Sequence, residues 1–362
     1  MWTRRAVLSS ALGAGLAAEL DKRKTYPSEW RRFLDPATEF EVVRLTDPAF
    51  TSRLPAPYNR AFAKRGGFLI YASDRNESQQ LYRMDLKNGE CRQITQAAAL
   101  DPDSASLLPD DRAVCYVDGT SLRQTALAGG RDRELYVAPE GWRVTAANVT
   151  GDGVSAVVAL AREEVSRLVL VGLAKGTATE ALETRGPIAD PMARPRRAQI
   201  LYRSGDSLRL VNFDGKQSRT LKTAPGGVGN ALWTPNGRAI VYLHVPEDAT
   251  RLNALRELTP DENSDKMVAP TSQFARFGMN ADATVFVGAS RNRNSPHVLI
   301  LVRAARRELT VCLHGSSDAA RVGPVFSTNS QRVYFHSDRH GKMALYQVRL
   351  ERFVEKTESE NC

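Results

Sequence analysis

The side chains best suited to metal binding or proton transfer are few and scattered in this sequence. Its five histidines are His244, His297, His314, His336 and His340. Only His336 and His340 have a spacing that would place two rings on one face of a helix, and the segment FHSDRHG that holds them predicts a turn between strands. The histidines therefore predict no clustered metal centre, and we expect them to be structural or exposed to solvent.

The cysteine spacing and the absence of a nucleophile motif also give no indication of a metal centre or a catalytic nucleophile. Cys91, Cys115, Cys312 and Cys362 include no CxxC pair, so their spacing excludes a zinc ribbon. Cys91 and Cys115 could approach each other on neighbouring structural units, but single buried thiols are the favoured interpretation. No GxSxG segment occurs, which argues against a peptidase or esterase nucleophile.

Basic residues outnumber acidic ones, 50 to 41, which gives a formal net charge of +9. This excess favours an anionic partner, such as an acidic polymer, an anionic membrane surface or nucleic acid. Because the lysines and arginines form no long run, we do not expect nucleic-acid binding, which needs a clustered basic stripe. Hydrophobic residues make up 42% of the chain, enough for a large core.

Residues 1–18 resemble an export signal. Thr3-Arg4-Arg5 precedes an apolar run that ends at Ala18, as in a twin-arginine signal, although Val7 stands where an aromatic residue is common. An ordinary secretory signal or an uncleaved anchor is the alternative. The run is short for a bilayer span, and no other stretch approaches that length. We therefore expect an exported protein, periplasmic or extracellular, with no membrane span beyond the signal segment.

The body of the chain repeats one unit seven times. In the clearest copy, residues 61–95, a turn precedes the apolar strand 68–72, an alternating strand covers 80–85, and Lys87-Asn88-Gly89 predicts a hairpin before an outer strand at 90–95. The inner apolar strands recur 40 to 48 residues apart, with midpoints at Ile70, Cys115, Val157, Leu201, Val241, Phe286 and Tyr334. This period predicts an all-β, seven-bladed β-propeller.

The two ends of the repeat region predict how the ring closes. The seventh unit ends about one strand short, and the segment 40–46 resembles an outer strand without inner strands before it. It is expected to complete the last blade and leave no open edge. We assign residues 40–353 to the propeller, 19–39 to an N-terminal lead and 354–362 to a polar tail. The charged stretch 21–32 of the lead is compatible with a short helix. Helical repeats are disfavoured because the apolar runs are short and alternating.

The blades resemble those of TolB-like propellers, and the overall layout resembles the oligogalacturonate lyase family of pectate lyases. The resemblance covers about residues 40–350. Four segments carry it best: EVVRLT (41–46), AFAKRGGFLIYASDR (61–75), NALWTPNGRAIVY (230–242) and VGPVFSTNSQRVYFHSDRHGKMALYQVRL (322–350). The resemblance implies β-elimination of oligogalacturonides, with a histidine base and a manganese ion held by three histidines and a glutamine.

The positions that the resemblance assigns to this chemistry carry other residues. Asn230 stands where the family has its base, and an amide is no base near neutral pH. Ala275 or a neighbour replaces one metal-binding histidine, Asp318 replaces the glutamine, and Arg321 and Gly323 replace the other two histidines. Asp318 is the only remaining candidate ligand. We therefore expect no cofactor in this chain.

Five residues remain as candidates for substrate contact. Arg321 could bind a uronate carboxylate in place of the metal, or could simply pair with Asp318 three residues earlier. Arg276 could join it or be a solvated loop arginine, and Asn230 could bind a sugar hydroxyl or be a turn residue. Tyr58 and Arg60, next to Asn59 before the first inner strand, are further candidates.

Two hypotheses about function follow. The first is a propeller of the oligogalacturonate lyase family that breaks down pectin fragments by β-elimination. The second is a non-catalytic propeller that binds an acidic oligosaccharide or a protein partner outside the cytoplasm. The family resemblance favours the first, whereas the missing histidines favour the second.

Overall fold

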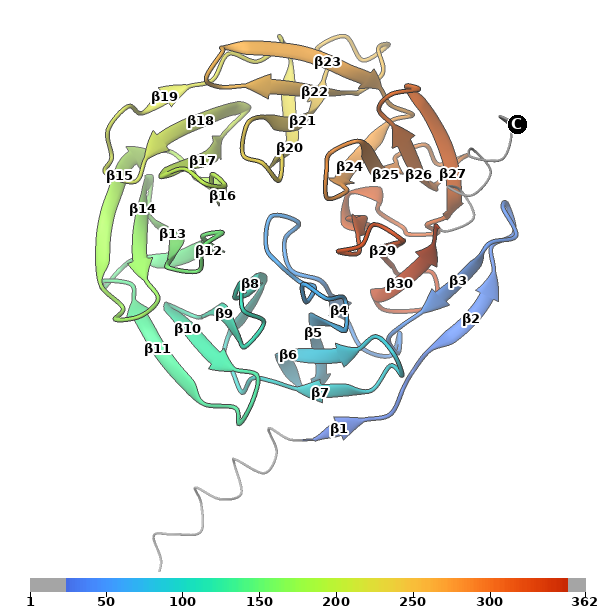
Figure 1. Cartoon of the computed structure of the whole chain (residues 1–362), viewed down its shortest axis with the longest axis horizontal. Helices are drawn as coiled ribbons and strands as arrows, with labels where there is room; N and C mark the ends of the chain where they lie inside the picture. The colour runs from blue at the N-terminus through green and yellow to red at the C-terminus, as the bar shows by residue number, and fades with distance from the viewer. Residues whose placement is uncertain (1–23, 351–362) are drawn as a thin grey trace, which may run out of the picture.

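The computed structural model, which describes residues 24–350, is a ring of seven antiparallel sheets (Figure 1), and the innermost strands surround a central cavity, here called the channel. The fold class predicted from the repeat is therefore confirmed. In chain order, the first three blades contain the strands β4 (Ser52–Arg53), β5 (Phe68–Asn76), β6 (Ser78–Asp85) and β7 (Cys91–Gln93); β8 (Leu100–Leu107), β9 (Ala113–Asp118), β10 (Ser121–Ala126) and β11 (Asp132–Val137); and β12 (Arg143–Val149), β13 (Ser155–Arg162), β14 (Val165–Gly172) and β15 (Ala178–Arg185).

The remaining blades repeat this order from the channel outward. They contain β16 (Ala189–Ala193), β17 (Gln199–Ser204), β18 (Ser207–Asn212) and β19 (Arg219–Thr220); β20 (Gly227–Trp233), β21 (Ile240–Val245), β22 (Ala254–Thr259) and β23 (Ser264–Pro270); β24 (Phe274–Met279), β25 (Val285–Ser290), β26 (His297–Val302) and β27 (Arg307–Leu313); and β28 (Val325–Phe326), β29 (Arg332–Ser337) and β30 (Ala344–Arg349). The short 3-10 helix η1 (Ala319–Arg321) precedes β28.

The apolar strands found in the sequence are the second strand of every blade, not the innermost one. Their midpoints are almost completely buried, as Ile70, Val157 and Phe286 illustrate. A second strand is covered by the neighbouring blades on both faces, so it is apolar throughout. The innermost strands border the channel and carry polar residues, so no apolar run marks them in the sequence.

The N-terminal segment closes the ring as predicted. Strand β3 (Glu41–Arg44) pairs with β30, and Val42 lies opposite Val348. The N-terminal lead adds one further strand to the last blade and one to the first blade. Strand β2 (Arg31–Leu34) pairs with β3, and β1 (Thr25–Tyr26) pairs with β7 of the first blade. The helix considered for the lead is thus wrong for residues 24–32, because the open edges of β3 and β7 offer backbone partners to an extended chain.

Two expectations fall on residues whose structure is not described. The export signal, residues 1–18, and the polar tail, residues 354–362, lie outside residues 24–350 and stay predictions. Within the described part of the chain, we find no helix long and apolar enough to span a membrane.

One loop enters the channel and shapes its interior. It joins β4 to β5, and its residues 54–64, here called the channel loop, project toward the middle of the ring (Figure 1). Asn59 anchors this loop to two blades, because its Nδ2 donates to the carbonyl oxygens of Asp103 at 2.8 Å and Ala147 at 3.0 Å. Asn148 of β12 adds a donated bond to the Tyr58 carbonyl at 3.0 Å.

Candidate functional site

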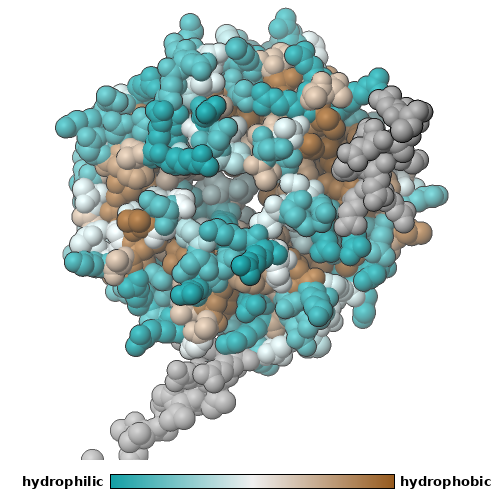
Figure 2. Space-filling view, in the orientation of Figure 1, coloured by the Kyte–Doolittle hydropathy of each residue, from teal (hydrophilic) through white to brown (hydrophobic). Residues whose placement is uncertain are grey.

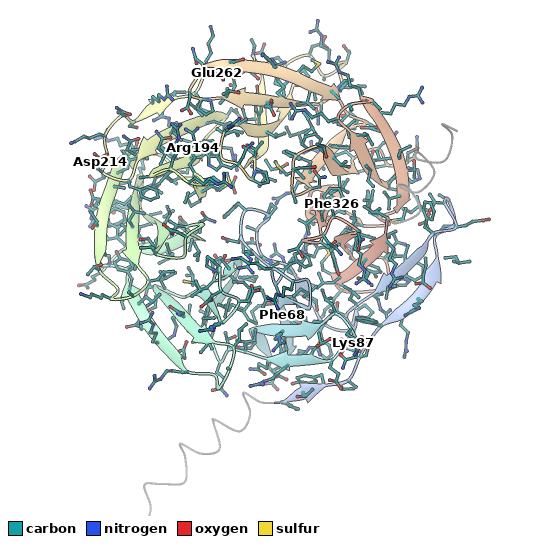
Figure 3. The ribbon with its side chains drawn as sticks, in the orientation of Figure 1. Phe68, Lys87, Arg194, Asp214, Glu262 and Phe326 are labelled. Carbon is teal, nitrogen blue, oxygen red and sulfur yellow. The ribbon has the colours of Figure 1, made fainter. Side chains whose placement is uncertain are left out.

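A cavity of about 970 Å³ occupies the centre of the ring and is lined by all seven blades and the channel loop. The space-filling view shows the molecule hollowed near its centre, with hydrophilic residues around the opening (Figure 2). Phe326 of β28 belongs to the inner wall, whereas Asp214 and Glu262 lie at the outer rim (Figure 3). A cavity of this volume is in the range of small-ligand sites.

The topology gathers charged residues at one mouth of this cavity. All innermost strands run in the same direction along the channel, so their first residues meet at one mouth and the turns that follow them meet at the other. The first mouth, here called the charged mouth, carries seven cavity-lining residues: Arg53, Asp103, Asp190, Arg203, Arg276, Arg291 and Arg321.

A β-bulge recurs where the innermost strands reach the charged mouth. The pairing of β16 with β17 shifts between Ala189 and Met192, that of β20 with β21 between Val228 and Ala231, and that of β24 with β25 between Phe274 and Arg276. A bulge re-aims the side chain of its extra residue. The bulges therefore give three blades equivalent positions at the cavity, occupied by Asp190, Asn230 and Ala275.

Three arginines of the cavity have carboxylate partners. Arg53 pairs with Asp103 at 3.4 Å, and Arg203 pairs with Asp190 at 3.1 Å. The predicted candidate Arg60 pairs with Asp111 and donates to the Leu108 carbonyl at 2.6 Å. The guanidinium of Arg60 is therefore engaged by the wall of the second blade and has little capacity left for a ligand.

Arg276 and Arg321 differ from these arginines because both are exposed and neither forms an ion pair within residues 24–350. The pairing of Arg321 with Asp318, which the spacing allowed, does not form. Instead, Asp318 caps η1, its Oδ1 accepting from the N–H of Ala320 at 2.9 Å. The two guanidiniums sit on neighbouring blades at the same mouth, with their hydrogen-bonding capacity free for an anion.

His336 lines the same cavity as these arginines and is fixed in its neutral form. Its Nδ1–H donates to the Val322 carbonyl at 3.0 Å, and its Nε2 accepts the N–H of Leu54 at 2.8 Å. The pKa of His336 is lowered to about 4, mainly by burial, and the positive charges of Arg53, Arg276 and Arg321 also lower it. The hydrogen bond to Val322 acts in the opposite direction and raises the pKa. Both ring nitrogens are occupied, so this cavity-lining histidine is structural.

Three other histidines are also held by local partners. The ring nitrogens of His244, His314 and His340 bond to the Pro225 carbonyl at 2.7 Å, the Ser290 carbonyl at 3.0 Å and the Tyr346 hydroxyl at 2.8 Å. These contacts support the structural roles expected for the histidines.

Asn230 links two blades through both ends of its amide. Its Nδ2 donates to the Phe277 carbonyl at 3.0 Å, and its Oδ1 accepts the Phe277 N–H at 3.3 Å. One N–H of Nδ2 remains for a ligand. Asn230 thus lines the cavity, but the structure uses most of its bonding capacity to join β20 to β24.

Tyr58 of the channel loop lies between the acidic and basic sides of the charged mouth. Burial is the main cause that raises the pKa of its phenol, and the charges of Asp190, Asp103 and Asp101 raise it further, whereas Arg276 acts against them. The phenol therefore stays protonated at neutral pH and can donate a hydrogen bond to a ligand.

The residues at the positions of the expected metal ligands do not fit a divalent cation. Ala275 and Gly323 supply no side-chain donor, Arg321 brings a positive charge, and the Asp318 carboxylate is turned toward η1 outside the cavity lining. Divalent cations require several carboxylate, imidazole or amide ligands around one point. No group of three or more such acidic, histidine or cysteine side chains occurs within residues 24–350.

The sequence identified much of this site but not its acidic side. The structure brings Tyr58, Arg60, Asn230, Arg276 and Arg321 to one cavity, and leaves Asp318 out. It adds residues that the sequence analysis missed, chiefly Asp190 with Arg203. One signal could have found Asp190, because it lies eleven residues before the midpoint Leu201, as Asn230, Ala275 and Gly323 do before theirs.

Fold and site together define a seven-bladed propeller with cavity-facing bulges on its innermost strands. Residues 20–168 match the family model described as oligogalacturonate lyase. An oligogalacturonide lyase of Pectobacterium atrosepticum is 22% identical over 381 residues, which cover 91% of this chain and 98% of that protein. The predicted resemblance is confirmed, and the chain is a relative of the oligogalacturonate lyases.

Two solved structures share the fold over the same extent, 91% of this chain and 98% of theirs. An oligogalacturonate lyase in complex with manganese superposes with a TM-score of 0.86 at 24% identity. An oligogalacturonate lyase from Vibrio parahaemolyticus superposes with a TM-score of 0.84 at 21% identity. At these identities the likeness concerns the fold, so the chemistry has to be argued from this chain's own residues.

Proposed function

We propose that the charged mouth binds an acidic oligosaccharide and that the chain does not carry out manganese-dependent β-elimination. One observation carries the binding proposal: Arg276 and Arg321 present two exposed guanidiniums, without acidic partners in the described chain, at a cavity of small-ligand size. A guanidinium binds a carboxylate through two parallel hydrogen bonds and needs no metal to do so.

The case against the elimination rests on the groups present. Removing the proton next to a uronate carboxylate requires a positioned base and a strong positive charge on the carboxylate. Asn230 at the bulge of β20 is an amide engaged with Phe277, and His336 has both nitrogens bonded to backbone. Arg276 and Arg321 supply the positive charge, so these residues support binding without proton removal.

The sequence left two candidate partners, an acidic oligosaccharide and a protein. The cavity favours the oligosaccharide. Hydroxyl and carboxylate groups of a sugar fit the arginine and aspartate side chains that line a concave cavity, whereas a protein interface needs a broad surface. We further propose that the protein acts outside the cytoplasm, on the export pattern of residues 1–18. The relatives' names support pectin fragments as the source of the ligand.

Calorimetric titration with trigalacturonate tests the binding proposal. The protein should bind trigalacturonate and should bind the neutral trisaccharide of galactose at least roughly tenfold more weakly. Arg276→Ala and Arg321→Ala should each weaken trigalacturonate binding about tenfold, because each removes a charge-assisted pair. The control Arg185→Ala, on the exposed outer strand β15, should bind like the parent protein. Equal affinity for the two trisaccharides would contradict the proposal.

Ultraviolet absorbance of the unsaturated product tests the second half of the proposal. Trigalacturonate incubated with concentrated protein and manganese should give no product above a protein-free control. Metal-dependent product formation that Arg321→Ala abolishes would overturn the claim that elimination is absent and would leave the binding claim intact.

A further inference from the structure

The charges at the charged mouth are divided between its two sides. Arg276 and Arg291 on the sixth blade and Arg321 before the seventh carry three positive charges without ion-pair partners within residues 24–350. Asp103 on the second blade and Asp190 on the fourth are each paired with one arginine. The cavity is therefore strongly cationic on one side, whereas the other side carries carboxylates that are partly compensated by arginines.

The acidic side has one further carboxylate. Asp101 lies close enough to raise the pKa of Tyr58, together with Asp103 and Asp190. Asp101 forms no ion pair within residues 24–350, so the three carboxylates on this side are matched by only two arginines, Arg53 and Arg203. A second anionic group placed here would meet unfavourable electrostatics, while a neutral hydroxyl would meet acceptors.

Asp190 is the acidic residue best placed to contact a ligand. It occupies the bulge of β16, the position that corresponds to Asn230 and Ala275 in the next two blades, and it lines the cavity. Its backbone has a positive φ of 50°, a conformation that L-residues adopt at a cost. Arg203 contacts only Oδ2 of Asp190, and the Asp190 side chain is 37% exposed. Oδ1 of Asp190 is therefore free to accept a hydrogen bond.

We infer that the ligand is a mixed oligosaccharide in which a uronate is linked to a neutral sugar. The uronate carboxylate binds at Arg276 and Arg321, and hydroxyls of the neutral sugar donate to Asp190 on the opposite side. This inference rests on the proposed function and narrows its substrate class. Asp190 acts as a specificity residue, because a hydroxyl on the neighbouring sugar can donate to its Oδ1, whereas a carboxylate there would place two acceptors together without a proton between them.

A matched set of disaccharides tests this inference. Digalacturonate is compared by calorimetry with the two disaccharides in which one of its residues is replaced by galactose. At low ionic strength, at least one mixed disaccharide should bind about fivefold to tenfold more tightly than digalacturonate. Asp190→Asn should bring this ratio close to one. Asparagine tolerates a positive φ as well as aspartate does, so the fold should be kept.

Asp214→Asn serves as the control for the charge change. Asp214 follows β18 at the outer rim of the fourth blade (Figure 3), pairs with Lys216 at 3.7 Å, and lines no part of the cavity. This variant should keep the parent preference for the mixed disaccharide.

The outcomes separate the two proposals. If no disaccharide and no trigalacturonate binds, the proposed function is wrong and this inference falls with it. If digalacturonate binds as tightly as both mixed disaccharides, or if Asp190→Asn leaves a measured preference unchanged, only the inference is overturned. A preference that Asp190→Asn removes and Asp214→Asn keeps supports it.

Discussion

The backbone N–H of Leu54 donates to Nε2 of His336 across 2.8 Å, which ties the channel loop to the last blade. The same imidazole donates from Nδ1 to the Val322 carbonyl, just after η1. One neutral ring thus joins the loop that carries Tyr58 to the segment that carries Arg321. The geometry of the charged mouth depends on this histidine keeping its unprotonated Nε2.

Acid should therefore destabilise the fold through His336. Its folded-state pKa of about 4 lies below its ordinary value of 6.5, so the unfolded chain takes up a proton first as the pH falls. Stability from this group is complete above about pH 6.5 and should fall by about 3 kcal/mol as the pH drops to about 4. Urea unfolding at pH 7 and pH 4.5 measures the difference.

His336→Gln is the matched variant for this measurement, because glutamine can accept one hydrogen bond and donate another but does not titrate. Its unfolding free energy should depend on pH less than that of the parent. An equal pH dependence in both proteins would assign the effect to other groups, such as His314, whose pKa burial also lowers.

The fold could be predicted from the sequence because the second strand of each blade is buried on both faces. Residues such as Val157 and Phe286 must then be apolar, so one apolar strand recurs in the sequence for each blade. Closure by β3 could also be predicted, since an unpaired strand edge at the last blade had one candidate partner. The strands β1 and β2 could not, because their pairing depends on edges formed by distant segments.

The site was only partly predictable because it depends on contacts across blades. The resemblance predicts that Asn230 stands at the position of the family's base, but its bonds to Phe277 arise from the approach of β20 to β24 and could not be predicted. Arg321 and Asp318 have a spacing that suits an ion pair, yet the backbone of η1 competes successfully for the carboxylate. The role of Asp190 depends on the bulge in β16 that directs its side chain to the cavity. The residues around Asp190 form no local motif that predicts a bulge.

Asn230→Ala should destabilise the protein by about 2 kcal/mol, because it leaves the N–H and C=O of buried Phe277 without their partners. Chemical unfolding monitored by intrinsic fluorescence measures this loss. Asn294→Ala, an exposed asparagine between β25 and β26, should change stability by less than about 0.5 kcal/mol. Equal effects of the two substitutions would show that the link between the fifth and sixth blades contributes nothing to stability.

The N-terminal lead should contribute to stability through Glu29. This carboxylate pairs at 2.9 Å with Arg75, whose side chain is only 2% exposed and lies over the ring of Tyr26. Glu29→Gln should cost about 3 kcal/mol, because it leaves a buried guanidinium without its counter-charge.

An exposed ion pair between the lead and the closure strand β3 provides the comparison. Arg32 and Glu41 lie 3.7 Å apart across β2 and β3, with side chains 64% and 50% exposed. Glu41→Gln should cost less than about 1 kcal/mol. Similar losses for the two variants in thermal unfolding would mean that the burial of Arg75 does not strengthen its dependence on Glu29.

The buried cysteine thiols should be unreactive toward thiol reagents in the folded protein and reactive in the unfolded protein. Cys91, Cys115 and Cys312 are free and buried, and burial raises the pKa of Cys91 to about 11 and that of Cys115 to about 12. The reactive species is the thiolate, which these sites disfavour. In a Cys362→Ser background, a colorimetric thiol reagent at pH 8 should therefore detect no rapidly reacting thiol before denaturation and three after it. Asn294→Cys in that background should add one fast thiol and prove that the reagent works. A fast reaction without the added cysteine would show that a blade opens under native conditions.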